Sequence, residues 1–98
     1  MNIEQKKNGS ALTLALEGRL DTTTAPELET ELKNSLEGIT DLKLDLEKLE
    51  YISSAGLRVL LSAQKTMNRQ GIMKVKNANE MILEIFDVTG FSDILTIE

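Results

Sequence analysis

The sequence predicts a single α/β domain over residues 1–98, with an N-terminal β-hairpin followed by βα units. Short segments in which apolar and polar residues alternate are interspersed with segments whose apolar residues recur every three or four positions. Their order, β-β-α-β-α-β-α-β, requires parallel crossover connections. The strands alternate rather than being apolar throughout, so we expect a mixed sheet with helices mainly on one face.

The first two strands are predicted at Ile3–Lys6 and Ala11–Glu17. Between them lies Lys7–Ser10, which contains Asn8-Gly9, a dipeptide typical of tight hairpin turns. The expected inward positions of the second strand are Leu12, Leu14 and Leu16.

A first helix is predicted after a threonine run, with Thr24 and Glu27 forming a capping box and Pro26 in the first turn. It is expected to stop at Gly38. Its apolar stripe is Leu28, Leu32 and Leu36.

The next strand is predicted around Leu42–Leu46, and a second helix over about Ala55–Gln70 that Gly71 ends. The expected buried side of this helix is Leu57, Leu60, Leu61 and Met67. The expected solvent side is Arg58, Ser62, Lys65 and Arg69.

Alternation resumes in Ile72–Lys76, which predicts a further strand. Asn77 and Glu80 then indicate the cap of a third helix that ends at Gly90. The buried face of this helix is expected to be Ile82, Ile85 and Phe86. A short last strand is predicted at Ile94–Ile97.

Composition excludes several classes of function. The net charge of −5 argues against nucleic acid as the main partner, because phosphate binding needs a basic face. There is no histidine and no cysteine, so we expect no Ser-His-Asp hydrolase, no thiolate metal site, no disulfide and no cofactor. No apolar run approaches the roughly 20 residues that span a bilayer, and no signal peptide is visible, so we expect a cytoplasmic protein.

The segment Tyr51–Leu57 is expected to join the end of a strand to a helix start. One interpretation is structural: Ser54 is the N-cap, accepting a hydrogen bond from the N–H of Gly56 or Leu57, and Ser53 is a turn residue. Gly56 would fall near the second helical position, where it weakens the helix but lets a partner approach the backbone closely.

The other interpretation is functional. A serine where a strand's C-terminal end meets a helix N-terminus lies where open α/β sheets bind ligands, and the helix dipole favours an added phosphate. A serine nucleophile lacks a base, since Lys65 is about three helical turns away. A phosphate-binding loop of the Gly-x-x-x-x-Gly-Lys type is absent.

Three stretches resemble bacterial anti-sigma factor antagonists, the STAS domain: Asp45–Leu60, Gly18–Asp21 and Phe86–Phe91. The resemblance implies an α/β domain that is not an enzyme. It implies that the unphosphorylated form binds an anti-sigma factor that is also a serine kinase of the histidine-kinase-like ATPase type, which frees the sigma factor. The kinase then phosphorylates a serine, and a PP2C-type phosphatase resets it.

The family motif, Asp-Ser-(Ser/Thr)-Gly, implies that Ser54 is the phosphorylated residue and aligns Gly56 with its glycine. Ser53 replaces the family aspartate and is a rival acceptor, and Ala55 replaces a hydroxyl residue, so both change the loop that a kinase would recognise. The implied partner surface is Asp21, Thr22, Thr23, Thr24, Ser53, Ser54, Ala55, Gly56 and Arg58. Asp21 has the alternative role of tightening its own turn, and Arg58 that of a solvated helix residue.

Two other functions remain open at this point. One is a STAS scaffold that uses the same face without a phosphorylation switch. The other is a small-ligand or nucleotide-binding module, because the fold places a helix N-terminus in a crevice. Phosphate transfer from a kinase would distinguish the switch from both.

Overall fold

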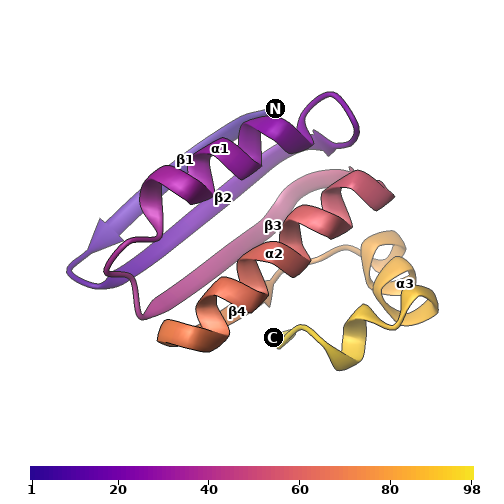
Figure 1. Ribbon diagram of the computed structural model, residues 1–98. Coiled ribbons are helices and arrows are strands. Elements are labelled where there is room, and N and C mark those ends of the chain that lie inside the picture. Colours follow the sequence, from indigo (N-terminus) through magenta and orange to yellow (C-terminus); the bar gives the residue numbers. More distant parts are fainter.

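The computed structural model describes residues 1–98 and contains a four-stranded mixed sheet in the order β1-β2-β3-β4. The strands are β1 (Asn2–Asn8), β2 (Ala11–Leu20), β3 (Asp41–Ile52) and β4 (Ile72–Lys76). The helices are α1 (Ala25–Ser35), α2 (Ser54–Gln70), α3 (Glu80–Thr89) and a 3₁₀ turn, η1 (Phe91–Asp93). β1 is antiparallel to β2, and the other neighbours are parallel. Figure 1 shows α1 and α2 over the same face of the sheet, as predicted.

The hairpin is confirmed, but its turn lies one residue later than the Asn-Gly pattern suggests. Asn8 pairs with Ala11, so the two turn residues are Gly9 and Ser10. Gly9 has φ +62°, which fits the first central position of a type II′ turn, where glycine is preferred.

The predicted capping box at the start of α1 is wrong. Thr24 is the N-cap residue, but its side chain does not bond to the helix. Its hydroxyl instead donates to the carbonyl oxygen of Arg19 at 2.7 Å and accepts from the N–H of Asp21 at 2.8 Å. The hydroxyl therefore ties the helix start back to the end of β2. The helix ends at Ser35, three residues before Gly38.

Two predictions near the C-terminus also need correction. The cap of α3 is Asn79, whose side chain accepts from the N–H of Ile82 at 2.8 Å. Asn77 is left-handed, with φ +62°, and donates to Asp45 across the sheet. The expected last strand is reduced to a single parallel bridge between Val75 and Ile97.

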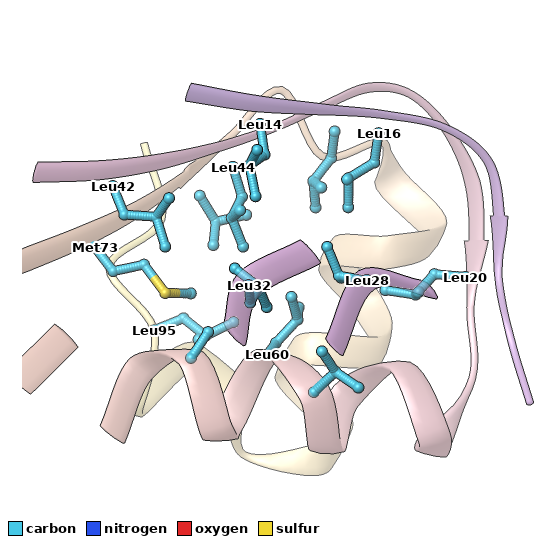
Figure 2. Packing of buried hydrophobic residues seen from close by; sticks show 14 of the residues in the cluster. Leu14, Leu16, Leu20, Leu28, Leu32, Leu42, Leu44, Leu60, Met73 and Leu95 are labelled. Carbon is cyan, nitrogen blue, oxygen red and sulfur yellow. The ribbon is translucent and has the colours of Figure 1, made fainter. Parts of the chain in front are cut away.

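One leucine-rich core lies between the sheet and the helices. Figure 2 shows Leu14, Leu16, Leu42 and Leu44 from the strands meeting Leu28, Leu32 and Leu60 from the helices. Leu61 was predicted to be buried but is half-buried, whereas Val59 and Ala63 are in the core. The apolar face of α2 is thus rotated from the predicted one. The opposite sheet face carries polar side chains such as Thr13, Lys43 and Asp45.

Candidate functional site

The candidate site lies where β2 and β3 end side by side. Leu20 is the register partner of Ile52, and the N–H of Ser53 donates to the carbonyl oxygen of Leu20 at 2.9 Å. Because the two strands are parallel, the loop that begins at Asp21 and the helix that begins at Ser54 emerge at the same sheet edge. The structure therefore brings together the two segments that the sequence predicted to form one surface.

Two irregularities in β3 determine how the chain reaches this edge. The register shifts between Ala15 and Glu17 and again between Gly18 and Arg19, and each time β3 contributes one residue more than β2. These bulges change the inward spacing from two residues to three, so Leu49 and Ile52 still face the core. The spacing Leu46-x-x-Leu49-x-x-Ile52 was the sequence signal for them, and it was missed.

The two adjacent serines differ in environment. Ser53 is the N-cap of α2, and its side-chain oxygen accepts from the N–H of Gly56 at 3.4 Å. Ser54 is the first residue of the helix and is exposed. The interpretation of Ser54 as the N-cap is therefore wrong, since its neighbour has that role. Ser54 is left with an accessible hydroxyl at the positive end of a helix with no acidic residue in its first turn.

Gly56 was expected to expose its backbone to a partner, and this expectation is wrong. It is buried, and a Cβ at this position would lie 2.7 Å from Cγ of Leu20 and 2.9 Å from Cγ1 of Ile52. Its absent side chain allows α2 to sit directly on the ends of β2 and β3. Its contribution to the predicted partner surface is therefore to position the residues around it.

Asp21 organises the loop before α1. Its Oδ1 accepts from the N–H of Thr23 at 3.0 Å and of Thr24 at 3.2 Å, and from the Thr23 hydroxyl at 2.8 Å. The Thr23 hydroxyl bond is the main cause that holds the pKa of Asp21 below its ordinary value. Nε of Arg19 lies 3.8 Å from Oδ2 of Asp21. Cζ of Arg19 lies over the Tyr51 ring, 4.5 Å from the ring centroid. Asp21 therefore does tighten its own turn, and its hydrogen bonds fix the Asp21–Thr24 loop beside the start of α2.

A shallow groove separates the starts of α1 and α2. Its lining consists of Thr22, Ala25, Pro26, Glu29, Ala55, Arg58 and Val59. Three of these residues, Thr22, Ala55 and Arg58, belong to the predicted partner surface. Pro26 and Glu29 were not predicted, because only the packing of α1 against α2 places them there.

No group of three acidic, histidine or cysteine side chains is arranged to hold a metal ion. The carboxylate nearest the serines in the chain is that of Glu50, which is exposed, and no lysine of α2 lies within its first two turns. The site presents an exposed hydroxyl, a rigid loop and a groove, which together suit binding by another protein. None of the helices has both the length and the apolar character required to traverse a bilayer.

Comparisons with known proteins match nearly the whole chain. A family model described as the STAS domain matches residues 2–98. The chain is 32% identical over 98 residues to the anti-sigma-B factor antagonist of Bacillus subtilis, covering 99% of this chain and 90% of that protein. It is 33% identical over 99 residues to a putative anti-sigma factor antagonist of Bordetella bronchiseptica, covering 99% and 85%.

The fold is also similar to a solved structure, that of the Bacillus cell fate determinant SpoIIAA in its phosphorylated form. The TM-score is 0.77 over 99% of this chain and 91% of that one. At 14% sequence identity this likeness concerns the fold alone.

Proposed function

The chain belongs to the STAS domain family, and from this premise we propose that it is an anti-sigma factor antagonist switched by phosphorylation of Ser54. It acts by binding, not by catalysis. Unphosphorylated, it binds an anti-sigma factor that is also a serine kinase of the histidine-kinase-like ATPase type, and the sigma factor is released in the cytoplasm. A PP2C-type phosphatase restores the binding form.

The difference between the two serines is the observation that carries the proposal. The Ser53 hydroxyl is used to cap α2, whereas Ser54 is exposed in the first turn, next to the Asp21–Thr24 loop. A kinase can reach the Ser54 oxygen without undoing the helix cap. The names of the two relatives, anti-sigma factor antagonists with about a third of their residues in common with this chain, support the class of partner.

The proposed switch is a phosphoryl transfer from Mg-ATP. The Ser54 oxygen forms a bond to the γ-phosphorus while the bond from that phosphorus to the bridging oxygen breaks, and ADP leaves. The hydroxyl proton passes to a base of the kinase, since this chain has no base next to Ser54. The phosphatase later cleaves the phosphoester with water.

The added charge is large enough to act as a switch without refolding. A phosphoserine carries about −1.5 to −2 charges near pH 7. With an acidic group of the partner about 7 Å away, each unit pair costs roughly 0.6 to 2.4 kcal/mol for effective dielectrics of about 80 to 20. Two charges double this cost, which corresponds to a roughly tenfold to thousandfold loss of affinity.

The test is phosphorylation by a candidate kinase encoded beside this protein's gene. After incubation with that kinase and Mg-ATP, intact mass spectrometry should show one added phosphate. Ser54→Ala should abolish the addition, and Ser53→Ala should retain it. Labelling that survives in Ser54→Ala and disappears in Ser53→Ala would move the switch to Ser53. No labelling of any variant by a kinase that binds the protein would favour a scaffold that does not switch.

A further inference from the structure

Arg58 lies one helical turn after Ser54 on α2. Residues four apart project from the same side of a helix, and both of these side chains are exposed. An acceptor that precedes its cation by four positions is the favourable orientation for an ion pair on a helix. Ser54 and Arg58 have this spacing, with the serine at the N-terminal position.

Two other cations, one on β2 and one on α1, already have partners within the chain. Arg19 engages Asp21 and the Tyr51 ring, and Lys33 lies 3.3 Å from Glu29. Arg58 lines the groove beside Glu29 but takes part in none of the four ion pairs of the molecule. Its guanidinium is therefore an unpaired cation next to the exposed serine.

We propose that Arg58 holds the phosphate of phosphorylated Ser54, so that the arginine is a positioning residue for the switch within this chain. This inference rests on the proposed phosphorylation of Ser54. The planar guanidinium can donate two parallel N–H bonds to phosphate oxygens, which an ammonium group cannot match. The phosphate is then held between the helix N-terminus and Arg58.

This pairing changes what the partner meets. Before phosphorylation, Arg58 is a free cation on the groove and available to an acidic group of the kinase. Afterwards the guanidinium is engaged by the phosphate, so phosphorylation adds negative charge and withdraws a cation in one step. The switch thus removes an attraction as well as adding a repulsion.

The test uses the full chain with phosphoserine incorporated at position 54 during translation, so that it depends on no kinase. Phosphorus NMR follows the second ionisation of the phosphate, which has a pKa of about 6 without special interactions. A nearby cation favours the dianion, so Arg58→Gln should raise this pKa by roughly 0.2 to 0.4, from the size of helix pairs of this spacing. Arg58→Lys should keep part of the lowering of the phosphate pKa, because lysine retains the positive charge but lacks the two parallel N–H donors of the guanidinium.

Lys65→Gln is the matched control, because Lys65 is an exposed cation of the same helix eleven residues from Ser54. It should leave the phosphate pKa unchanged. Asp21, Arg19, Glu29 and Glu50, the other charged groups named around the site, are present in every variant, so their influence cancels. An Arg58→Gln protein whose phosphate titrates like the parent would overturn the pairing.

A second readout does not depend on titration. The Arg58 Nε–H resonance should shift between the unmodified and the phosphorylated parent at pH 7.5, and those of Arg69 and Arg19 should not. A stationary Arg58 resonance would also contradict the pairing. Neither result concerns kinase labelling, so failure of this inference is distinguishable from failure of the proposed function.

Discussion

Gly56 and Leu20 are in contact in a way that leaves no room for a side chain on the glycine: a Cβ at position 56 would lie 2.7 Å from Cγ of Leu20. Leu20 is 0% exposed, and Ile52, the other neighbour, is 1% exposed. Neither side chain can turn into solvent to make space. The start of α2 is therefore fixed by direct packing on the ends of β2 and β3.

Gly56→Ala should destabilise the protein. Overpacking of this kind costs about 1–3 kcal/mol, and the better helix propensity of alanine returns up to about 1 kcal/mol. We expect a net loss of about 1 kcal/mol in the free energy of unfolding, measured by urea denaturation. Ser54→Ala, an exposed change in the same turn, is the control and should stay within about 0.5 kcal/mol of the parent.

A double-mutant cycle with Leu20→Ala identifies the cause of that loss. Removing the Leu20 Cγ frees the space that the new Cβ needs, so Gly56→Ala should cost less in the Leu20→Ala background than in the parent. Equal costs in the two backgrounds would mean that the packing against Leu20 is not the reason for the glycine.

Patterns that depend on one sheet face or one helix stripe could be predicted from the sequence. The alternation of Leu12, Leu14 and Leu16, and of Met73 and Val75, is produced by burial on one face, and these residues are in the core. Which side of α2 faces the core was harder to predict, because neighbouring positions on different sides of the helix are all apolar: Leu57, Val59, Leu60 and Leu61. Only the packing decides that Val59 is buried and Leu61 is not.

The caps were the least predictable parts of the site. Each helix start offers several side chains that can accept a hydrogen bond from a backbone N–H. Which of them caps the helix depends on the other hydrogen bonds that each side chain can form. The Thr24 hydroxyl is already hydrogen-bonded to the backbone of Arg19 and Asp21, which the fold brings close to it. Ser53 rather than Ser54 caps α2, because the N–H of Ser53 is fixed to the carbonyl oxygen of Leu20 and the helix begins one residue later.

Ser53→Ala should destabilise the protein more than Ser54→Ala. Loss of an N-cap hydroxyl costs about 0.5–2 kcal/mol, and the long 3.4 Å bond to the N–H of Gly56 places Ser53 toward the lower end. Ser53→Asp should keep most of the stability, because aspartate is an equally good N-cap. Chemical denaturation of the three variants measures the difference. A larger loss from Ser54→Ala would show that the cap has been assigned to the wrong serine.

The Asp21 carboxylate should make stability depend on acid pH. The pKa of Asp21 is lowered from 3.8 by hydrogen bonds to its charged form. A lowered pKa in the folded state stabilises the protein at pH values above the unfolded-state pKa, and this stabilisation is lost as the pH falls through the folded-state pKa. Asp21→Asn should therefore be less stable than the parent near pH 7. As the pH falls from about 4 to about 2, the variant should lose less stability than the parent does.

Thermal melts over this pH range give the comparison for Asp21. Glu84→Gln, which removes an exposed carboxylate on α3, is the control and should follow the parent. Parallel acid profiles for Asp21→Asn and the parent would mean that the Thr23 and Thr24 bonds to Asp21 do not persist in solution.

Ser54→Asp tests whether the phosphate acts by local charge. Residue 54 is the first of α2, where a carboxylate gains roughly 0.3–1 kcal/mol from the helix dipole, so the variant should unfold within about 1 kcal/mol of the parent or be more stable. Its binding to the kinase should weaken, but less than that of the phosphoprotein, because it carries one charge and fewer acceptor oxygens. Ser62→Asp, on an exposed position in the middle of α2, should bind like the parent.

Calorimetric titration of Ser54→Asp with the kinase, beside thermal melts, separates charge from structure. If the repulsion is exposed to solvent, raising the salt concentration should restore part of the binding, since exposed charges are screened over about 8–10 Å at physiological ionic strength. If it is buried in the interface, salt should have little effect. A variant that melts many degrees below the parent would attribute the binding defect to altered structure. One that binds as tightly as the parent would show that a negative charge at residue 54 is not what separates the two proteins.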